Sequence, residues 1–380
     1  MDKEIKIENL ENNIINEEAV IKREKVKLSK DSSEEDRIIE ERKKKVVGFF
    51  KKSPYLLILG ILIVLVVLGV YLRSLPMMDH NGQPGLWDIT TNTWTLGPDL
   101  DPFLFLRYAK EDIANNGSLP LIDNFRNVPL GFDTSTELQM VPHMIVLTYK
   151  LVNLFGTYNV DFAGVLMPVL FFGLTIISFF FFVREIFRKR DEKINLKANI
   201  IATISTLFMI VIPEFISRTI AGIPEKESVG FFFMFLAFYL FLRAWKTEKT
   251  VYAGVIAILA GISTALMGLT WGGVTYIYVT IGLATLAAFM IDKVKIKETI
   301  IYSLWLVSSL LLTLLLTNRY SLSGFVTSLD TGLASLVFGI LIINILLWYT
   351  NIRSYELQLS CHKLFHFKLT RNRWRCCFIF

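Results

Sequence analysis

The segment from Tyr55 to Leu72, YLLILGILIVLVVLGVYL, most constrains the fold of this chain, because it holds no charged residue over 18 positions. A run of this length and apolarity is typical of a transmembrane helix. It is not a cleavable signal peptide, because about fifty mostly polar residues precede it and no small-residue cleavage site follows. In the whole chain 53% of residues are hydrophobic and 13% are aromatic, more than a soluble domain of this size can bury. The chain is therefore predicted to be a polytopic membrane protein.

Lysine and arginine gather beside the apolar segments, which indicates the orientation of the protein rather than binding to nucleic acid. Residues 1–53 are interpreted as a charged cytosolic tail without ordered structure, because they are rich in Glu and Lys and become basic just before the first span. The later connections between apolar segments alternate: those with three or more basic residues are assigned to the inside, and those with two or fewer to the outside. This pattern predicts an all-α protein with about eight transmembrane helices in residues 54–350, near 55–72, 165–183, 198–216, 229–242, 251–269, 274–291, 299–317 and 332–350.

Two connections are predicted to face outside. The first external loop, residues 75–159, is long and carries nine acidic residues between Asp79 and Glu137. Its apolar segment Met140–Phe155 is predicted to lie at the outer membrane surface, because a span there would turn the basic connection 184–197 outward. The second external loop, residues 217–228, reads SRTIAGIPEKES.

The segment 351–380 is basic and holds all three cysteines of the chain. Cys361, His362, His366 and Cys376 could bind zinc, but their spacing matches no standard zinc pattern. A non-native or out-of-frame end, or a simple basic cytosolic tail, is the favoured interpretation.

Each external loop carries a pair of acids separated by one residue. Asp99 and Asp101 lie in GPDLDPFLFLRYAKEDI, and Glu225 and Glu227 lie in the second loop. Carboxylate oxygens suit Mg²⁺ or Mn²⁺, so the two loops could converge on one ion that assists the departure of a phosphate. Each pair taken alone is also explained as a turn or a helix N-terminus, where Pro and acidic residues are favoured.

Several motifs, in this order, resemble those of the oligosaccharyltransferase catalytic subunit family, and most of all the archaeal single-subunit enzymes of N-glycosylation. The resemblance covers about residues 54–350 and implies a GT-C-like glycosyltransferase architecture. The motifs are DPFLFLR at Asp101–Arg107, PLG at Pro129–Gly131, Arg218 with Ala221-Gly222 and Glu225-Lys226-Glu227, and WGG at Trp271–Gly273.

The resemblance implies transfer of an oligosaccharide from a dolichol-phosphate-type lipid carrier to Asn in Asn-x-Ser/Thr of an acceptor polypeptide, at the outer face of the cell membrane. It implies that Asp101, Glu225 and Glu227 hold Mg²⁺ or Mn²⁺, and that Asp101, Glu225 and Arg218 act in catalysis. Arg218 is assigned to ordering the acids or contacting donor phosphate. The family usually has Asp where this chain has Glu225, which keeps the charge but adds a methylene.

The family's Trp-Trp-Asp motif, which binds the acceptor, does not occur in this sequence. Either the chain is a C-terminally truncated form or a partner chain supplies the rest, and the chain alone is expected not to glycosylate. One alternative is a related mannosyltransferase that uses a polyprenyl-phosphate sugar and shares the first-loop Asp motif. Another is a transporter, although transporters place ionisable residues inside their spans and these spans are nearly free of charge.

Overall fold

The structure is a computed structural model that describes residues 39–42, 54–115, 117–189 and 195–349. The chain divides into two compact units, residues 1–61 and residues 62–380. In the first unit the described residues, 39–42 and 54–61, are helical. Both predicted tails lie outside the described residues, apart from 39–42 in the first. The four residues considered as zinc ligands belong to the second tail, 351–380, and are therefore not described.

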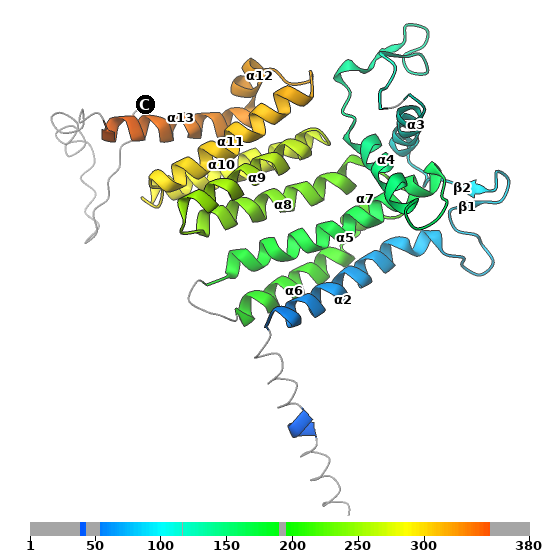
Figure 1. Ribbon diagram of the computed structural model, residues 1–380, viewed down its shortest axis with the longest axis horizontal. Coiled ribbons are helices and arrows are strands. Elements are labelled where there is room, and N and C mark those ends of the chain that lie inside the picture. The colour runs from blue at the N-terminus through cyan, green and yellow to red at the C-terminus, as the bar shows by residue number, and fades with distance from the viewer. Residues whose placement is uncertain (1–38, 43–53, 116, 190–194, 350–380) are drawn as a thin grey trace, which may run out of the picture. The chain divides into compact units, whose positions relative to one another are not determined.

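The predicted all-α membrane architecture is confirmed, because every segment expected to span the bilayer forms a helix (Figure 1). Among the described residues, six helices are long and apolar enough to cross a membrane, and a bent pair makes a seventh. About eight were expected. The remaining one is α13, whose apolar part Thr331–Leu347 is shorter than a span. The long helices are α2 Pro54–Ser74, α5 Val160–Phe187, α6 Leu196–Val211, α8 Lys226–Lys246, α9 Thr250–Gly268, α10 Thr275–Met290, α11 Ile296–Leu316 and α13 Leu329–Tyr349.

The bent pair consists of α6 and the short helix α7, Pro213–Thr219, whose axes differ by 65°. Ile212 between them is extended, with φ −65° and ψ 125°. Proline disfavours the helical conformation of the residue before it but is well suited to the first position of a new helix, so Pro213 accounts for the break. The predicted span 198–216 is therefore bent, since α6 ends at Val211 and α7 extends into the predicted second loop.

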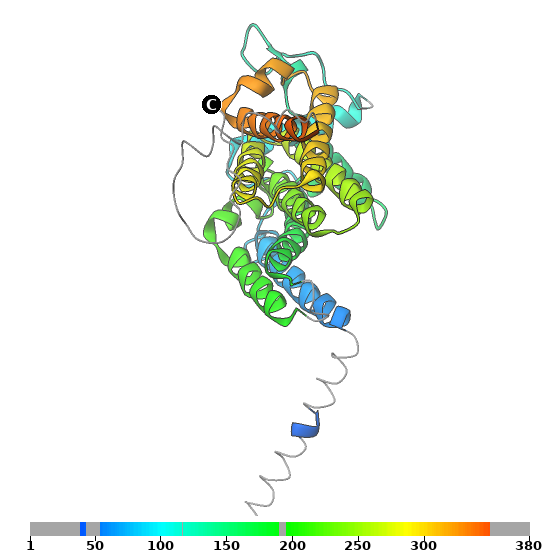
Figure 2. The same ribbon diagram turned by 90° about the vertical axis from the view of Figure 1, so that its left-hand side faces the viewer.

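Some helices of the second unit pack on their neighbours in sequence, and others pack across intervening helices. Helix α5 contacts α6 and α8, α8 contacts α9, and α9 contacts α11. Helix α13 lies beside α10, as the view in Figure 2 also indicates. Close approach of α9 and α11 depends on Gly261, because a Cβ there would collide with Ser308 Oγ and the Trp305 carbonyl.

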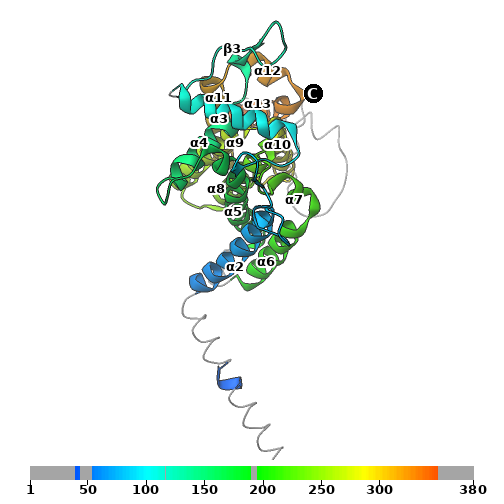
Figure 3. The ribbon, with the colours of Figure 1, turned by 90° about the vertical axis from the view of Figure 1, so that its right-hand side faces the viewer.

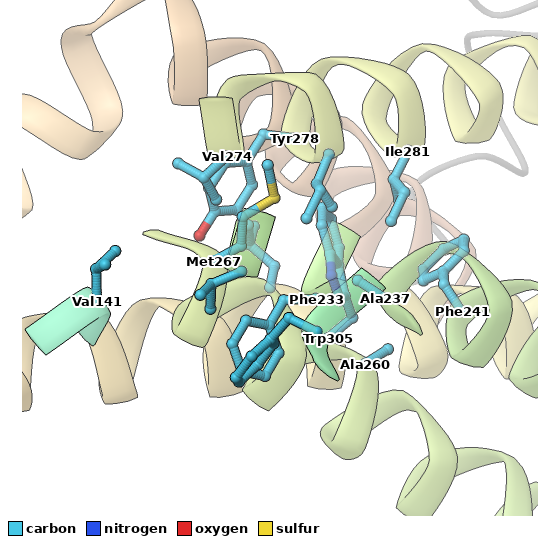
Figure 4. Close-up of a cluster of buried hydrophobic side chains, with 14 of the residues drawn as sticks. Val141, Phe233, Ala237, Phe241, Ala260, Met267, Val274, Tyr278, Ile281 and Trp305 are labelled. Atoms are coloured by element: carbon cyan, nitrogen blue, oxygen red, sulfur yellow. The ribbon is translucent and has the colours of Figure 1, made fainter. Parts of the chain in front are cut away.

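The core is centred on Trp305 of α11, which is fully buried (Figure 4). Its indole N–H donates a hydrogen bond of 3.0 Å to Thr264 Oγ1 on α9. Its ring packs edge-on against Phe241 of α8 at 5.5 Å and lies 5.7 Å from the ring of Tyr278 on α10. Because the indole N–H has a partner, this large side chain adds apolar contact without an unsatisfied donor.

The first external loop is folded rather than extended. It contains two short hairpins, β1 Trp87–Asp88 with β2 Thr93–Trp94 and β3 Ile122–Asp123 with β4 Phe132–Asp133. It also contains helices α3, Leu100–Ala114, and α4, Met140–Val152, which pack on each other and on α5. Figure 3 shows α3 and α4 at one end of the bundle, close to the start of α8. The segment predicted not to span the membrane is indeed a short helix, α4.

Candidate functional site

The first acidic pair stands at the N-terminus of α3. Asp99 is the N-cap residue, and its carboxylate accepts a hydrogen bond of 2.8 Å from the backbone N–H of Leu100. Asp101 lies in the first turn, where a negative charge is favoured by the helix dipole. The interpretation of this pair as a helix N-terminus is confirmed, and the helix begins at Leu100.

The second acidic pair stands at the N-terminus of α8. Glu225 is the N-cap residue and is buried, and Glu227 lies in the first turn. The connection between α7 and α8 comprises only residues 220–225, so the predicted loop 217–228 is too long at both ends. Its residues at 217–219 belong to α7, and those at 226–228 belong to α8.

One backbone hydrogen bond joins the two loops, and a second joins the second loop to α5. The N–H of Gly97, two residues before Asp99, donates to the carbonyl of Gly222 at 2.8 Å. The N–H of Gly222 donates in turn to the carbonyl of Val165 on α5 at 3.0 Å. Gly222 has a φ of +83°, a conformation that side chains disfavour, and it also lies against Leu86. The sequence therefore needs glycine at 222 for the two acidic pairs to meet.

Arg218 of α7 lies between the two pairs. Its Nη1 is 3.8 Å from Asp99 Oδ2 and 3.6 Å from Glu225 Oε1. Asp101 instead faces Lys226, with 3.6 Å between Oδ2 and Nζ, and its side chain is 55% exposed. The structure thus brings Asp101, Arg218, Glu225 and Glu227 to one end of the bundle. The first-loop acid linked to Glu225 through Arg218 is Asp99.

Burial, followed by the negative charges of Glu227 and Asp99, raises the pKa of the Glu225 carboxyl to about 8. Arg218 is half exposed, so water screens its attraction to Glu225. Among the residues that the structure describes, no three His, Cys, Asp or Glu side chains are grouped closely enough to hold a metal ion.

A row of aromatic rings lies beside this site. Phe215 of α7 packs against Phe231 of α8 at 4.7 Å, and Phe231 meets Trp271 edge-on at 6.1 Å. Trp271 in turn lies 6.1 Å from Tyr276, which is largely exposed. The WGG motif at Trp271–Gly273 is thereby connected to the first turns of α8, close to Glu225.

Sequence analysis missed a second polar cluster in the first external loop. Asp123, which is buried, accepts hydrogen bonds from Arg107 Nη1 at 3.0 Å and from the Tyr108 hydroxyl at 2.9 Å. The hydrogen bonds from Arg107 hold the pKa of Asp123 at about 2, despite burial. Arg126 links Tyr108 to Glu137. Arg107 was noted only as part of a motif, and no local signal pointed to its partner on β3.

The PLG motif closes the turn between β3 and β4. The N–H of Gly131 donates to the carbonyl of Asn127 at 3.1 Å, and both residues have positive φ. This motif therefore shapes the loop that carries Asp123 and does not contribute a side chain to the acidic site.

Comparison with known proteins gives a family match over most of the chain. The family model described as "Oligosaccharyl transferase STT3, N-terminal" matches residues 91–371. A curated relative, the glycosyltransferase subunit STT3B of Arabidopsis thaliana, is 25% identical over 111 residues, which is 29% of this chain and 15% of that protein.

Two solved structures of the Archaeoglobus fulgidus oligosaccharyltransferase have the same fold over their matched parts. One, AglB in complex with an inhibitory peptide and a dolichol-phosphate, gives a TM-score of 0.61 at 20% identity, covering 81% of this chain and 35% of that one. The other, in complex with Zn and sulfate, gives a TM-score of 0.60 at 19% identity, covering 78% and 37%. The chain thus spans little more than a third of the length of these structures.

Proposed function

This chain belongs to the oligosaccharyl transferase STT3 family, and on that premise we propose that it supplies the membrane-embedded half of a glycosyl-transfer site. The reaction proposed is transfer of an oligosaccharide from a dolichol-phosphate-type carrier to Asn in Asn-x-Ser/Thr. The chain is an integral membrane protein. We propose that its N-terminus and basic connections face the cytosol, and that the two acidic loops face outside.

One observation carries this proposal: Arg218 lies between an acid of the first loop and an acid of the second. Backbone bonds through Gly97 and Gly222 hold the two loops together, so this placement does not depend on flexible side chains alone. A cationic group beside clustered carboxylates suits a phosphate-bearing donor, because the carboxylates can bind a cation and the guanidinium can contact phosphate oxygens.

The acidic residues fit part of a ligand set for a divalent cation. The raised pKa of Glu225 results from burial near other carboxylates, and a bound cation would offset their negative charge. We propose Asp101, Glu225 and Glu227 as ligands of Mg²⁺ or Mn²⁺, with Asp99 as the alternative ligand from the first loop. Mg²⁺ sites often use one or two carboxylates together with substrate phosphates and water, which would complete the set.

When bound, such a cation would act as a Lewis acid that stabilises the departing phosphate. Arg218 would orient Asp99 and Glu225 and contact the donor phosphate from the side of α7. Lys226 forms an ion pair with Asp101 at the same end of α8. A divalent cation bound by Asp101 would have to displace the Lys226 ammonium group.

Binding of the donor, measured without the acceptor reaction, tests this proposal. The full chain in lipid nanodiscs is titrated with dolichyl phosphate by isothermal titration calorimetry, with Mn²⁺ present or removed by EDTA. We expect binding that requires Mn²⁺ and that weakens at least tenfold in Glu225→Gln and Arg218→Met. Binding of equal strength with and without Mn²⁺ would contradict a metal role.

The two first-loop acids can be separated in the same assay. If Asp101 is the ligand, Asp101→Asn weakens Mn²⁺-dependent binding more than Asp99→Asn does; the reverse order assigns Asp99. Ser323→Ala on α12, Leu322–Thr327, is a surface control expected to leave binding unchanged. No binding by the native chain under any condition would overturn the proposed function.

A further inference from the structure

Arg73 is a fully buried arginine near the end of α2. No carboxylate of the described residues forms an ion pair with it. Instead its guanidinium lies 4.0 Å from the ring centre of Phe172 on α5. A buried, unpaired charge in an apolar bundle is costly, so a fold that keeps one uses it for a specific purpose.

The hydrogen bonds of Arg73 reach both sides of the break between α6 and α7. Nη1 donates to the carbonyl of Ile210 at 2.9 Å, and Nε donates to Thr219 Oγ1 at 2.8 Å. Ile210 lies in the last turn of α6, where carbonyls lose their partners within the helix. Thr219 is the last residue of α7. One planar guanidinium therefore connects the two helices across the bend.

The backbone of Arg73 holds the next residues of the chain. Its carbonyl accepts a hydrogen bond of 2.9 Å from the N–H of Ala221. The following residue, Gly222, is the one that joins Gly97, and the connection then ends at Glu225. Arg73 thus contacts the start of the segment 220–225 with its backbone and the end of α7 with its side chain.

We propose that Arg73 is a positioning residue, which fixes the bend between α6 and α7 and thereby sets where Arg218 and Glu225 stand relative to Asp99. Its importance for transfer rests on the proposed function, but the geometry it imposes does not. Arginine is needed because its planar guanidinium holds several N–H donors in fixed, different directions, toward both acceptors at once. The ammonium group of lysine is compact and has no such fixed fork.

Distance measurements on the full chain in nanodiscs test the bend directly. Spin labels are placed at Ser217→Cys on α7 and Thr157→Cys before α5, both exposed, with Cys361, Cys376 and Cys377 replaced by Ser. Double electron–electron resonance should give one narrow distance in the native background. We expect the distribution to widen at least twofold in Arg73→Met, and to widen less in Arg73→Lys.

A matched control removes a different buried hydrogen bond. Tyr302→Phe deletes the bond from the Tyr302 hydroxyl to the Ala334 carbonyl, far in sequence from the break, and should leave the distance unchanged. If Arg73→Met does not fold, Thr219→Val removes one of the two acceptors while Arg73 stays in place, and the same widening is expected.

An unchanged distance distribution in a folded Arg73→Met or Thr219→Val protein would overturn the proposal. The distance measurement involves neither donor nor acceptor. Failure of the native chain to bind donor would therefore count against the proposed function and leave the role of Arg73 intact.

Discussion

The backbone N–H of Gly97 donates a hydrogen bond of 2.8 Å to the carbonyl of Gly222. This single bond joins the two external loops just ahead of their acidic pairs. It depends on a left-handed backbone at Gly222 and on the absence of a side chain there, since a Cβ would lie 2.6 Å from Leu86 Cδ1. The acidic site is therefore built on a backbone contact that only glycine permits.

Replacing Gly222 should separate the loops. We expect Gly222→Ala to lower stability by about 1–3 kcal/mol, because the new Cβ is strained at positive φ and collides with Leu86. Thermal unfolding in detergent, followed by tryptophan fluorescence, measures this loss. Gly117→Ala is the matched control: Gly117 also has positive φ, but nothing lies within 4 Å of its Cβ position. Equal losses in both variants would show that the contact with Leu86 and Gly97 is unimportant.

Glu225 should make stability depend on pH. Its pKa is raised from 4.5 to about 8, so the folded protein favours the protonated form. The contribution to stability is complete below about pH 4.5 and is lost as pH rises through 8. We expect the melting temperature of the native chain without added metal to fall between pH 5 and pH 9. Glu225→Gln, which cannot ionise, should show a flatter dependence of melting temperature on pH. Identical pH profiles in the two proteins would argue against a buried Glu225 carboxyl with a raised pKa.

Asp123 should make stability depend on pH in the opposite direction to Glu225. Hydrogen bonds from Arg107 lower its pKa from 3.8 to about 2, so its contribution is complete above pH 4 and is lost as pH falls toward 2. Asp123→Asn removes the buried charged partner of Arg107, which keeps Glu111, and should cost about 1–3 kcal/mol at pH 7. Hydrogen exchange of the β3–β4 hairpin measures the effect. The control is Asp133→Asn on β4, an exposed residue whose carboxylate accepts a hydrogen bond from the N–H of Ser135, and it should change exchange only near Ser135.

Gly261 should be required for the contact between α9 and α11. We expect Gly261→Ala to destabilise the bundle by about 1–3 kcal/mol, because the added methyl group overlaps Ser308 and the Trp305 carbonyl. The midpoint of unfolding in mixed micelles measures this change. Gly339→Ala on α13, where nothing lies within 4 Å, should be neutral or slightly stabilising in a helix. A neutral Gly261→Ala would mean that the two helices can separate at no cost.

The sequence by itself determined the membrane class, the order of the apolar helices, the short helix α4, and the two acidic pairs with their family resemblance. These properties are local, since length, apolarity and the flanking charges of a segment decide whether it enters a membrane. The bend at Ile212 was equally local, and Pro213 was its signal.

Only the tertiary structure decided which side chains meet. It linked Asp99, rather than Asp101, to Glu225 through Arg218, paired Arg107 with Asp123, and placed Arg73 across the helix break. The contacts of Arg73 with Thr219 and of Arg218 with Asp99 join residues far apart in the chain. Their partners depend on the packing of α2, α5, α7 and α8 and on single glycines that let loops touch, which no short window of sequence encodes.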